Sequence, residues 1–367
     1  MNEYLVKDLL TIRNGKDHKQ LGDGKYPVFG SGGIMRYVDS YLYDKPSILL
    51  PRKGTLDNIQ YCDSPFWCVD TTYYSEVNTS LANPYYLYRY LSLLNLKGLD
   101  SGTALPSMTF DSYYQIKVSL PSIDIQNKIG RALYQIDQKI ALNTRMNAEL
   151  EAMAKQLYDY WFVQFDFPDE NGNPYKSSGG KMVYNPTLKR EIPAGWEVSQ
   201  IVDILDRVES TPRLTTSEYL SQGKYPIIDQ TTDIYFAGFT NREEAILYQY
   251  PAIVFGDHSC AVKYINYPFA RGADGTQIVL SKNKNVSIEY LYFYIMGINI
   301  GKGYARHFGF VKDYPLIIPS KSSAMLFKNS AEKLFTKMMQ LRLEIIQLTH
   351  LRDSLLPMLM NGQVIVE

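Results

Sequence analysis

The sequence predicts an α+β protein in which two pseudo-symmetric α/β globular domains are separated by two long antiparallel helices of the coiled-coil type. Two observations predict this fold class. One region recurs about 200 residues downstream, and each copy is followed by a long segment in which apolar residues recur every three or four positions. The length of 367 residues agrees with this, because it is long for one compact domain and comfortable for two.

The repeat is visible in three pairs of short segments. Residues 25–27 and 224–226 both read Lys-Tyr-Pro, and residues 47–50 (SILL) correspond to residues 252–255 (AIVF). Upstream, residues 8–10 (DLL) correspond to residues 203–205 (DIL). A period of about 200 residues is far longer than that of a solenoid repeat, so it indicates a duplicated domain. We place the first domain at residues 1–120 and the second at residues 196–318.

Each domain is followed by a segment with coiled-coil spacing, at residues 121–163 and at residues 319–367, which include a C-terminal tail. Leu120-Pro121 and Ile318-Pro319 mark the entrances, because proline suits the first turn of a helix. A helix of about 36 residues is about 54 Å long and is unstable with an exposed apolar stripe, so we expect the two helices to pair. The residues expected at this seam or in partner docking are Ile129, Ile136, Ile140, Asn143, Asn147, Leu150, Leu157, Leu334, Met338, Leu341, Ile345, Leu348 and Leu355.

The helix pairing has two open alternatives: each helix lies back on its own domain, or pairs only with another subunit. Asn143 and Asn147 lie near the middle of the first stripe, where polar residues commonly fix register and partner choice. Between the first helix and the second domain, residues 164–195 are rich in Gly, Pro, Asn and Ser. This composition predicts a linker that wraps the surface, with Trp196 anchoring the entry to the second domain.

The segment VFGSGGI, residues 28–34, raises the question of a cofactor site, because glycine clusters after a strand can cradle a nucleotide. The residues that follow continue as strand rather than as helix. The second repeat has residues 228–231 (IDQT) where the first has residues 29–32 (FGSG). We therefore predict a tight turn in one domain and no cofactor in this chain.

A second motif resembles the Asn/Asp-Pro-Pro-aromatic loop with which adenine methyltransferases hold a flipped base. It occurs as residues 63–66 (DSPF) and again as residues 266–269 (NYPF), at equivalent places in the repeat. Both copies lack the first proline, and no intact cofactor motif accompanies them. We predict turns that enter buried strands through Phe66 and Phe269.

Cysteine and histidine usage favours neither disulfides nor metal. Cys62, Cys68 and Cys260 form no CxxC pair, and the four histidines are scattered, so we expect no metal site and a reducing cytoplasm. The charged N-terminus does not resemble a signal peptide, and no segment has the apolar length needed to cross a bilayer, so no membrane partner is expected.

Four further segments are distinctive: YPVFGSGGIMRYV with ILLPRKG, VSLPSIDIQNKIGRALYQIDQKIALN, QLYDYWF before the linker to IPAGW, and the closing LRDSLLPMLMNGQV. Through these segments, and across essentially its whole length, the chain resembles the specificity subunits of type I DNA restriction–modification systems. The order and duplication of these segments are more specific than any one of them. One departure is the second helix entrance, IIPSKSSAMLFKNSAEKL, which lacks the Gln of IDIQNKI.

The resemblance implies a non-catalytic DNA-recognition subunit. Each repeat would be a target recognition domain that reads one half of a bipartite, asymmetric site in double-stranded DNA. The helices would fix the gap between the halves and dock two adenine-N6 methyltransferase subunits. S-adenosylmethionine would be bound by those partners and not by this chain. Whether restriction and translocation subunits join the complex is left open.

Sequence reading requires Arg, Lys, Asn or Gln aimed at base edges, with hydroxyl and amide groups on phosphates. In the first domain the loop at residues 51–55 follows a buried strand, and the glycine turn and residues 100–108 are further candidates. The first set of candidate DNA-binding residues is Ser31, Arg36, Tyr37, Arg52, Lys53, Thr55, Thr103 and Ser107. The corresponding places in the second domain contain Gln230, Thr231, Thr232, His258, Lys263, Arg271, Arg306, His307 and Lys312.

Two other functions compete with this interpretation. One is a self-sufficient adenine DNA methyltransferase that uses the degenerate glycine and DSPF motifs. The other is a coiled-coil adaptor between proteins whose domains never meet nucleic acid. The net charge of zero argues mildly against a free-standing nucleic-acid binder, so any DNA affinity must come from local patches or from a basic partner.

Overall fold

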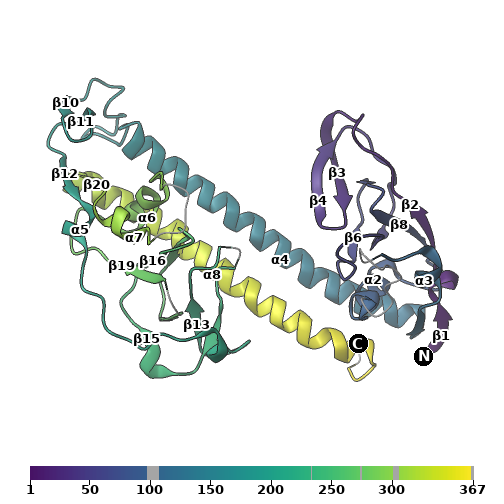
Figure 1. Ribbon diagram of the computed structural model, residues 1–367. Helices are drawn as coiled ribbons and strands as arrows, with labels where there is room; N and C mark the ends of the chain where they lie inside the picture. The colour runs from purple at the N-terminus through teal and green to yellow at the C-terminus, as the bar shows by residue number, and fades with distance from the viewer. Residues whose placement is uncertain (97–106, 233, 273–274, 301–305, 365–367) are drawn as a thin grey trace. The chain divides into compact units, whose positions relative to one another are not determined.

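The computed structural model describes residues 1–96, 107–232, 234–272, 275–300 and 306–364. The chain forms two compact units, one of Met1–Leu142 with Ile345–Glu367 and one of Asn143–Glu344. Two long helices, α4 (Ile123–Tyr158) and α8 (Lys321–Met360), each contribute a segment to both units (Figure 1). Each unit therefore contains one α/β head and a pair of helix segments that come from distant parts of the chain.

The head of the first unit is built around β5 (Ser47–Pro51), whose five residues are all buried. It belongs to a four-stranded sheet of order β2-β8-β5-β6, with β2 at Leu10–Asn14, β8 at Thr72–Val77 and β6 at Gln60–Cys62. A second sheet has the order β4-β3-β7, with β4 at Gly33–Val38, β3 at Asp23–Gly30 and β7 at Trp67–Cys68. The remaining elements are β1 (Asn2–Leu5) paired with β9 (Lys117–Leu120), and helices α1 (Val6–Leu9), α2 (Pro84–Ser92) and α3 (Phe110–Tyr114).

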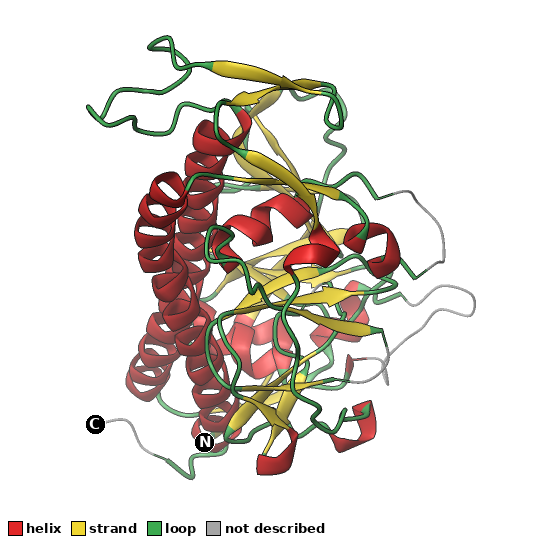
Figure 2. Cartoon of the chain, turned by 90° about the vertical axis from the view of Figure 1, so that its left-hand side faces the viewer, coloured by secondary structure: helices red, strands yellow, loops and turns green. Residues whose placement is uncertain are grey.

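The head of the second unit has the same plan around β16 (Ala252–Gly256), which is also fully buried. One sheet has the order β17-β16-β19, with β17 at Val262–Ile265 and β19 at Thr276–Val279. The other has the order β14-β13-β18-β15, with β14 at Gly238–Thr240, β13 at Tyr225–Ile228, β18 at Phe269–Arg271 and β15 at Ile246–Leu247. The other elements are β12 (Glu197–Gln200) paired with β20 (Pro315–Ile318), α5 (Ile201–Ile204), α6 (Ile288–Met296) and α7 (Phe308–Lys312). Figure 2 distinguishes the strands of the heads from the helices by colour.

Strand pairing confirms the duplication. β5 pairs antiparallel with β6 and β8, as β16 does with β17 and β19. β3 pairs parallel with β7, as β13 does with β18. The register is also conserved, because Tyr61 lies opposite Ile48 and Tyr264 lies opposite Ile253. The expected fold class is therefore found, an α+β fold with two repeated heads and two long helices.

Within each unit the helix segments run antiparallel, and their seam is buried. Arg352 of α8 contacts Asp137 of α4 in the first unit, and Leu359, further along α8, lies in the same core as Leu133. In the second unit Asn147 Nδ2 donates a hydrogen bond to the carbonyl of Met338 at 2.9 Å. Each of the thirteen expected seam residues is buried or half-buried.

Aromatic residues that the seam prediction omitted form a cluster in the core of the second unit. Phe162, on a π-helical turn at Asp159–Val163 that extends α4, packs edge-on against Phe327 of α8 with ring centroids 4.9 Å apart. Tyr158 and Phe335 are buried in the same cluster. The helix α8 has 40 residues, longer than the expected length, because its last turn packs into the core of the first unit through Leu356 and Met360.

The two helix entrances differ, as the missing glutamine predicts. In α4 the buried Gln126 accepts a hydrogen bond from the Asn83 N–H at 3.0 Å and donates to the carbonyl of Leu81 at 3.0 Å, so it joins α4 to the start of α2. In α8 the Ser320 hydroxyl accepts from the Ser323 N–H at 3.3 Å, which is an ordinary N-terminal cap.

The motifs considered as cofactor or base-binding loops have structural roles. Ser31 and Gly32 form the two-residue turn of the β3–β4 hairpin, and Gly33 has φ of +125°, a conformation that favours glycine. Phe66, directly before β7, and Phe269, the first residue of β18, are fully buried. Both predictions from the sequence, a tight turn and turns into buried strands, are confirmed.

The segment between α4 and the second head is more ordered than its composition indicates. Residues 164–195 include the hairpin of β10 (Met182–Asn185) and β11 (Arg190–Pro193). Phe165 and Phe167 are buried, and Phe167 stacks on Trp196 with ring centroids 4.9 Å apart. Trp196 therefore anchors the entry of the second head, as expected.

Candidate nucleic-acid interface and helical seam

In the first unit three loops converge where β5 ends. The Arg52 N–H donates to the carbonyl of Thr71 at 2.9 Å, and the Met108 N–H donates to the carbonyl of Arg52 at 3.0 Å. Asn58 Nδ2 donates to the carbonyl of Ser31 at 2.7 Å, which fixes the turn of the β3–β4 hairpin beside the same loop. Main-chain and amide hydrogen bonds thus place the hairpin turn, the loop at 52–55 and the segment at 107–109 together.

The second unit repeats this junction where β16 ends. The Asp257 N–H donates to the carbonyl of Gly275 at 2.6 Å, and the His307 N–H donates to the carbonyl of Asp257 at 2.9 Å. The Ser259 hydroxyl donates to the carbonyl of Gln230 at 2.6 Å. The backbone framework is therefore shared between the repeats, whereas the side chains that it presents differ.

The candidate residues of the first unit fall into two groups. Lys53, Thr55 and Tyr37 are exposed, and Ser31 and Ser107 are half-buried at the junction. Arg52 is half-buried, donates to the carbonyl of Asp70 at 3.3 Å and lies 5.9 Å from the ring centroid of Tyr73. Arg36 donates to the carbonyl of Leu21 and thereby braces the base of the hairpin. Thr103 lies outside the described residues.

In the second unit the candidates are also split between surface and interior. Thr232 and Arg306 are exposed, Gln230, Thr231, His258 and Lys312 are half-buried, and His307 is buried directly before α7. Arg271 is half-buried, and burial lowers the pKa of its guanidinium, with a smaller contribution from the neighbouring charge of Arg213.

Lys263 corrects the expectation of a surface cation. It is 5% exposed, and its Nζ donates to the carbonyls of Ile234 at 2.8 Å and Tyr235 at 3.3 Å. Burial lowers the pKa of Lys263 to about 8, and the carboxylate of Asp229, 3.8 Å away, offsets part of that effect. Sequence reasoning could not distinguish it from a solvated lysine because alternation along a strand does not tell which face the sheet buries.

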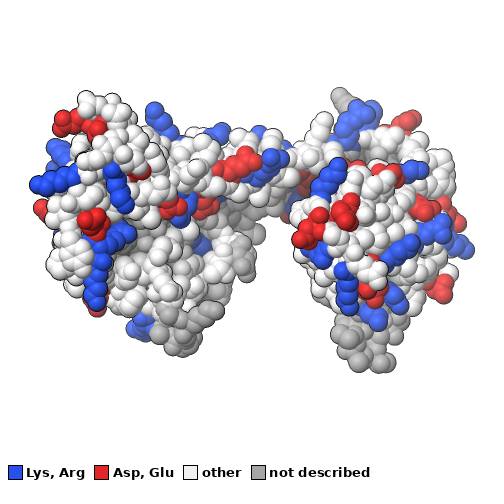
Figure 3. Space-filling view, turned by 90° about the horizontal axis from the view of Figure 1, so that it is seen from above, with Lys and Arg blue, Asp and Glu red and all other residues white. Residues whose placement is uncertain are grey.

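The first unit has a surface hollow of about 660 Å³ beside its junction. It is lined by the hairpin turn at 30–35 and by residues 17–19 and 69–71. Exposed Ile34 and Met35 border this hollow. Basic and acidic side chains are interspersed over the face drawn in Figure 3.

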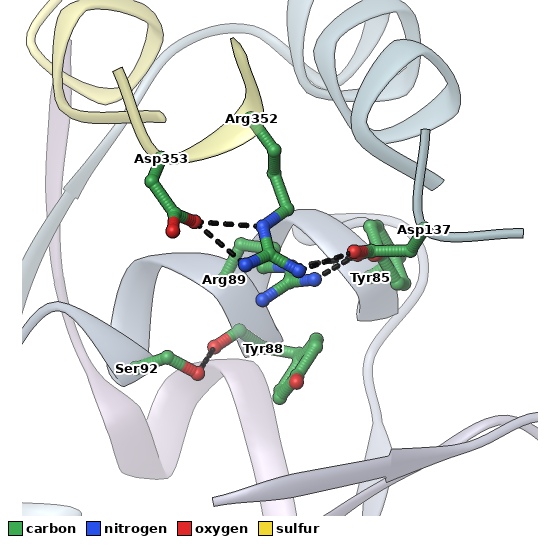
Figure 4. Close-up of polar contacts among 7 residues, drawn as sticks. All are labelled: Tyr85, Tyr88, Arg89, Ser92, Asp137, Arg352 and Asp353. Carbon is green, nitrogen blue, oxygen red and sulfur yellow. Dashed lines mark hydrogen bonds and ion pairs between the residues drawn. The ribbon is translucent and has the colours of Figure 1, made fainter. Parts of the chain in front are cut away.

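A charged cluster joins both helix segments of the first unit to its head. The carboxylate of Asp137 in α4 contacts the guanidinium groups of Arg352 in α8, at 2.8 Å, and of Arg89 in α2, and it accepts from the Tyr85 hydroxyl (Figure 4). Arg352 also pairs with Asp353 at 2.7 Å. The side chains of Arg89, Asp137 and Arg352 are 12%, 19% and 20% exposed. The apolar seam pattern does not reveal this cluster because these residues flank the seam.

The two seam asparagines differ in their hydrogen bonding. Asn147 is satisfied by Met338, but Asn143 is fully buried and neither its Oδ1 nor its Nδ2 has a hydrogen-bond partner in the described structure. A buried amide without partners costs folding free energy. Asn143 is therefore a cost to the stability of the seam.

The α4 segment of the second unit also has an apolar exposed face. Met153 is 56% exposed, Tyr160 is 39% exposed, and Val163 on the adjoining π-helical turn is 50% exposed. A hollow of about 740 Å³ lies along residues 152–164. Soluble proteins rarely expose several large apolar side chains next to one another unless a partner binds there.

Neither a metal centre nor a membrane span is found in the described parts of the chain. Those residues contain no group of three or more His, Cys, Asp or Glu side chains placed to hold a metal ion. Among the described helices, none combines the length and apolar character that crossing a bilayer demands.

Comparison with known proteins agrees with this geometry. The family described as "Type I restriction modification DNA specificity domain" matches residues 1–152 and 193–324. The chain is 27% identical over 308 residues to the type I restriction enzyme MjaIX specificity subunit of Methanocaldococcus jannaschii, covering 77% of this chain and 69% of that protein. It is also 42% identical over 66 residues to the HindI specificity subunit of Haemophilus influenzae, covering 18% of this chain and 14% of that protein.

A solved structure shares the fold. The S subunit of a type I restriction–modification system from M. genitalium aligns with 98% of this chain and 95% of its own, with a TM-score of 0.66 and 16% sequence identity. That likeness concerns the fold, whereas the family assignment rests on the sequence match in both repeats. The chain accordingly belongs to the type I restriction–modification DNA specificity family and is a specificity subunit, the non-catalytic DNA-recognition component of such a system.

Proposed function

We propose that each repeat reads one half of a bipartite, asymmetric DNA target through the loops that converge at the end of β5 or β16. The observation that carries the proposal is a shared junction with different side chains: Arg52 in the first repeat is replaced by Asp257 in the second. Two copies of one framework with unlike surfaces are suited to two unlike half-sites, because base readout depends on the side chains and not on the backbone plan.

The residues that we propose to contact DNA are candidates that the structure leaves exposed or half-buried. They are Ser31, Tyr37, Arg52, Lys53, Thr55 and Ser107 in the first repeat, and Gln230, Thr231, Thr232, His258, Arg306 and Lys312 in the second. Arg36, Lys263 and His307 act inside the fold in this proposal, since their contacts or burial hold them there.

We further propose that the paired helices set the gap between the half-sites. A helix of 36 residues such as α4 is about 54 Å long, and DNA rises about 3.4 Å per base pair, so helix length converts into a number of base pairs. Four residues inserted at residue 142 of α4, matched by four at residue 344 of α8, add about 5.4 Å and lengthen the gap by one or two base pairs. A motif with an unchanged gap would contradict this role.

The methyl transfer is assigned to two adenine-N6 methyltransferase subunits that bind S-adenosylmethionine and dock on the helices. The exposed apolar face of Met153, Tyr160 and Val163 supports docking on α4. Met153→Glu is expected to abolish copurification with the methyltransferase subunit, whereas Gln135→Glu, which is exposed on α4 outside the hollow, is expected to leave it intact. Loss of copurification in both variants would indicate a general effect of charge instead.

Methylome sequencing tests the whole proposal. Cells that carry this chain with its methyltransferase partner are expected to methylate one bipartite motif, and cells that carry either protein alone are expected to methylate none. Methyl transfer from S-adenosylmethionine to DNA by the purified chain would overturn the proposal.

A further inference from the structure

One position on the strand that follows the central strand recurs in both repeats. Gln60 lies opposite Leu49 in the β5–β6 pair, and Lys263 lies opposite Val254 in the β16–β17 pair. Leu49 and Val254 correspond in the repeated SILL and AIVF segments. Gln60 and Lys263 are therefore equivalent residues, although their side chains share only the ability to donate hydrogen bonds.

In the first repeat Gln60 holds the end of the hairpin strand. Its Nε2 donates to the carbonyl of Gly30 at 2.8 Å, and Asn58 Nδ2 donates to the carbonyl of the next residue, Ser31, at 2.7 Å. Gly30 ends β3 and Ser31 begins the turn. Two side-chain amides thus fix the main chain where the turn between β3 and β4 leaves the sheet. We call this turn the recognition loop of the first repeat.

In the second repeat Lys263 holds the equivalent recognition loop, which connects β13 to β14. Asp229 stands three residues after the Lys-Tyr-Pro segment, as Gly30 does in the first repeat. The Lys263 ammonium lies 3.8 Å from the Asp229 carboxylate and donates to the carbonyls of Ile234 and Tyr235, which close the same loop. The Ser259 hydroxyl donates to the carbonyl of Gln230, just as Asn58 donates to that of Ser31.

A buried ammonium is an expensive way to stabilise a fold. Lys263 is 5% exposed, and burying a charge costs more than burying an apolar side chain of similar size. At the equivalent position of the first repeat, Gln60 makes its hydrogen bond to the Gly30 carbonyl with an uncharged amide. The property common to both repeats is an attachment of the recognition loop to the sheet.

We propose that Gln60 and Lys263 are positioning residues, each of which holds the recognition loop of its own repeat and so maintains the selectivity for one half-site. Neither residue needs to touch DNA for this role. Gln60 ties the last carbonyl of β3, directly before the turn, to the neighbouring strand β6, and Lys263 ties two loop carbonyls to β17. Base readout tolerates only small displacements of the reading side chains. The consequence for half-sites rests on the proposed function, whereas the attachment of the loops does not.

Hydrogen exchange on the full-length chain tests the attachment without DNA. Lys263→Met removes two hydrogen bonds from a charged donor, so it is expected to speed exchange in residues 229–232 and 234–237 by about tenfold or more and to leave residues 30–36 unchanged. Gln60→Leu is expected to do the reverse, and Lys263→Arg, which keeps charged donors, is expected to restore slow exchange. Unchanged exchange in the loop of the substituted repeat, or faster exchange throughout both units, would overturn the proposal.

Methylation by the complex tests the consequence. Gln60→Leu and Lys263→Met, each assembled with the methyltransferase partner, are expected to relax base selection in opposite halves of the motif and to keep the gap. Relaxation in both halves by either variant, or intact selection in both variants despite loosened loops, would overturn the positioning role. If the wild-type complex methylates no bipartite motif, the proposed function fails, and the exchange experiment still decides whether the loops are attached.

Discussion

The cluster around Asp137 allows a quantitative prediction about how the helices are fastened to the first head. Asp137→Asn keeps the shape of the side chain and removes the charge that faces Arg89 and Arg352. Breaking a buried ion pair by removing one partner costs about 3–5 kcal/mol, because the other charge remains buried. Arg352 keeps its contact with Asp353, and the three side chains retain some solvent exposure. We therefore expect a loss of about 2–3 kcal/mol in the free energy of unfolding of the first unit.

Native-state hydrogen exchange is the suitable assay, because it reports the two units separately. Peptides from α2, from the first half of α4 and from the last two turns of α8 are expected to lose protection together, while peptides from β16 and α6 keep theirs. Glu76→Gln is the matched control. Glu76 is also an acidic residue of the first unit in an ion pair, with Arg13, but their side chains are 41% and 53% exposed. Such exposed pairs are worth about 0–1 kcal/mol.

A double-substitution cycle with Arg352→Gln separates the pair from other effects. Asp137 and Arg352 share one contact, so the combined loss is expected to be smaller than the sum of the single losses by about 1–2 kcal/mol. If Asp137→Asn unfolds the first unit no more easily than Glu76→Gln does, the cluster does not fasten the helices and the reasoning is refuted.

Three further predictions concern the seam, the buried lysine and the recognition loops. Asn143→Leu is expected to raise the free energy of unfolding by about 1–3 kcal/mol, because it removes an amide that is buried without partners. Asn147→Leu is expected to lower the free energy of unfolding by about 1 kcal/mol, because it removes the hydrogen bond to Met338. Urea unfolding measures both changes. Lys263 has a native pKa of about 8 against an ordinary value of 10.5, so between these values the unfolded chain binds more protons and the contribution of Lys263 to stability increases as the pH rises. That rise is expected in the difference between wild-type and Lys263→Met unfolding free energies. Arg52→Ala is expected to weaken binding of the assembled complex to its target by about 1–3 kcal/mol if it reads a base, measured by titration of a labelled duplex.

Each of these has an outcome that would count against it. Equal destabilisation by Asn143→Leu and Asn147→Leu would mean that packing volume, and not amide satisfaction, governs the seam. A flat difference curve between about pH 8 and pH 10 would show that Lys263 keeps its ordinary pKa in the folded chain. For Arg52, the surface variant Lys7→Ala serves as the control, and equal weakening by both would point to unspecific attraction of phosphates.

Periodicity and duplication predicted the architecture because both are local properties of the sequence. The matched Lys-Tyr-Pro segments and the SILL and AIVF strands predicted the repeat, and the strands pair as a duplication requires. Spacing of three and four predicted the long helices and a seam in which Ile129, Met338 and Leu341 are buried. The glycine turn could also be predicted, because the residues after it continue as a strand and not as a helix.

Functional detail was harder to predict because it depends on burial and on neighbours that are remote in sequence. Lys263 reads as a surface cation in the sequence, yet the sheet turns it inward onto Ile234 and Tyr235, 29 and 28 residues away. The cluster at Asp137 joins residues separated by 48 and 215 positions, and no local pattern relates them. The candidate surface cations Lys53 and Arg306 remain predictions for DNA contact.

The sequence alone determined the fold class, the duplication and the resemblance to a family of DNA-recognition subunits, because hydrophobic spacing and short motifs can be recognised without knowing the tertiary structure. Folding in three dimensions selects which polar groups reach the surface and which hold the loops. Burial of Asn143 and Lys263 and the meeting of Asp137 with two arginines follow from how distant segments pack. The free energy of a buried polar group depends on its neighbours in space, and those neighbours come from elements far apart in the sequence.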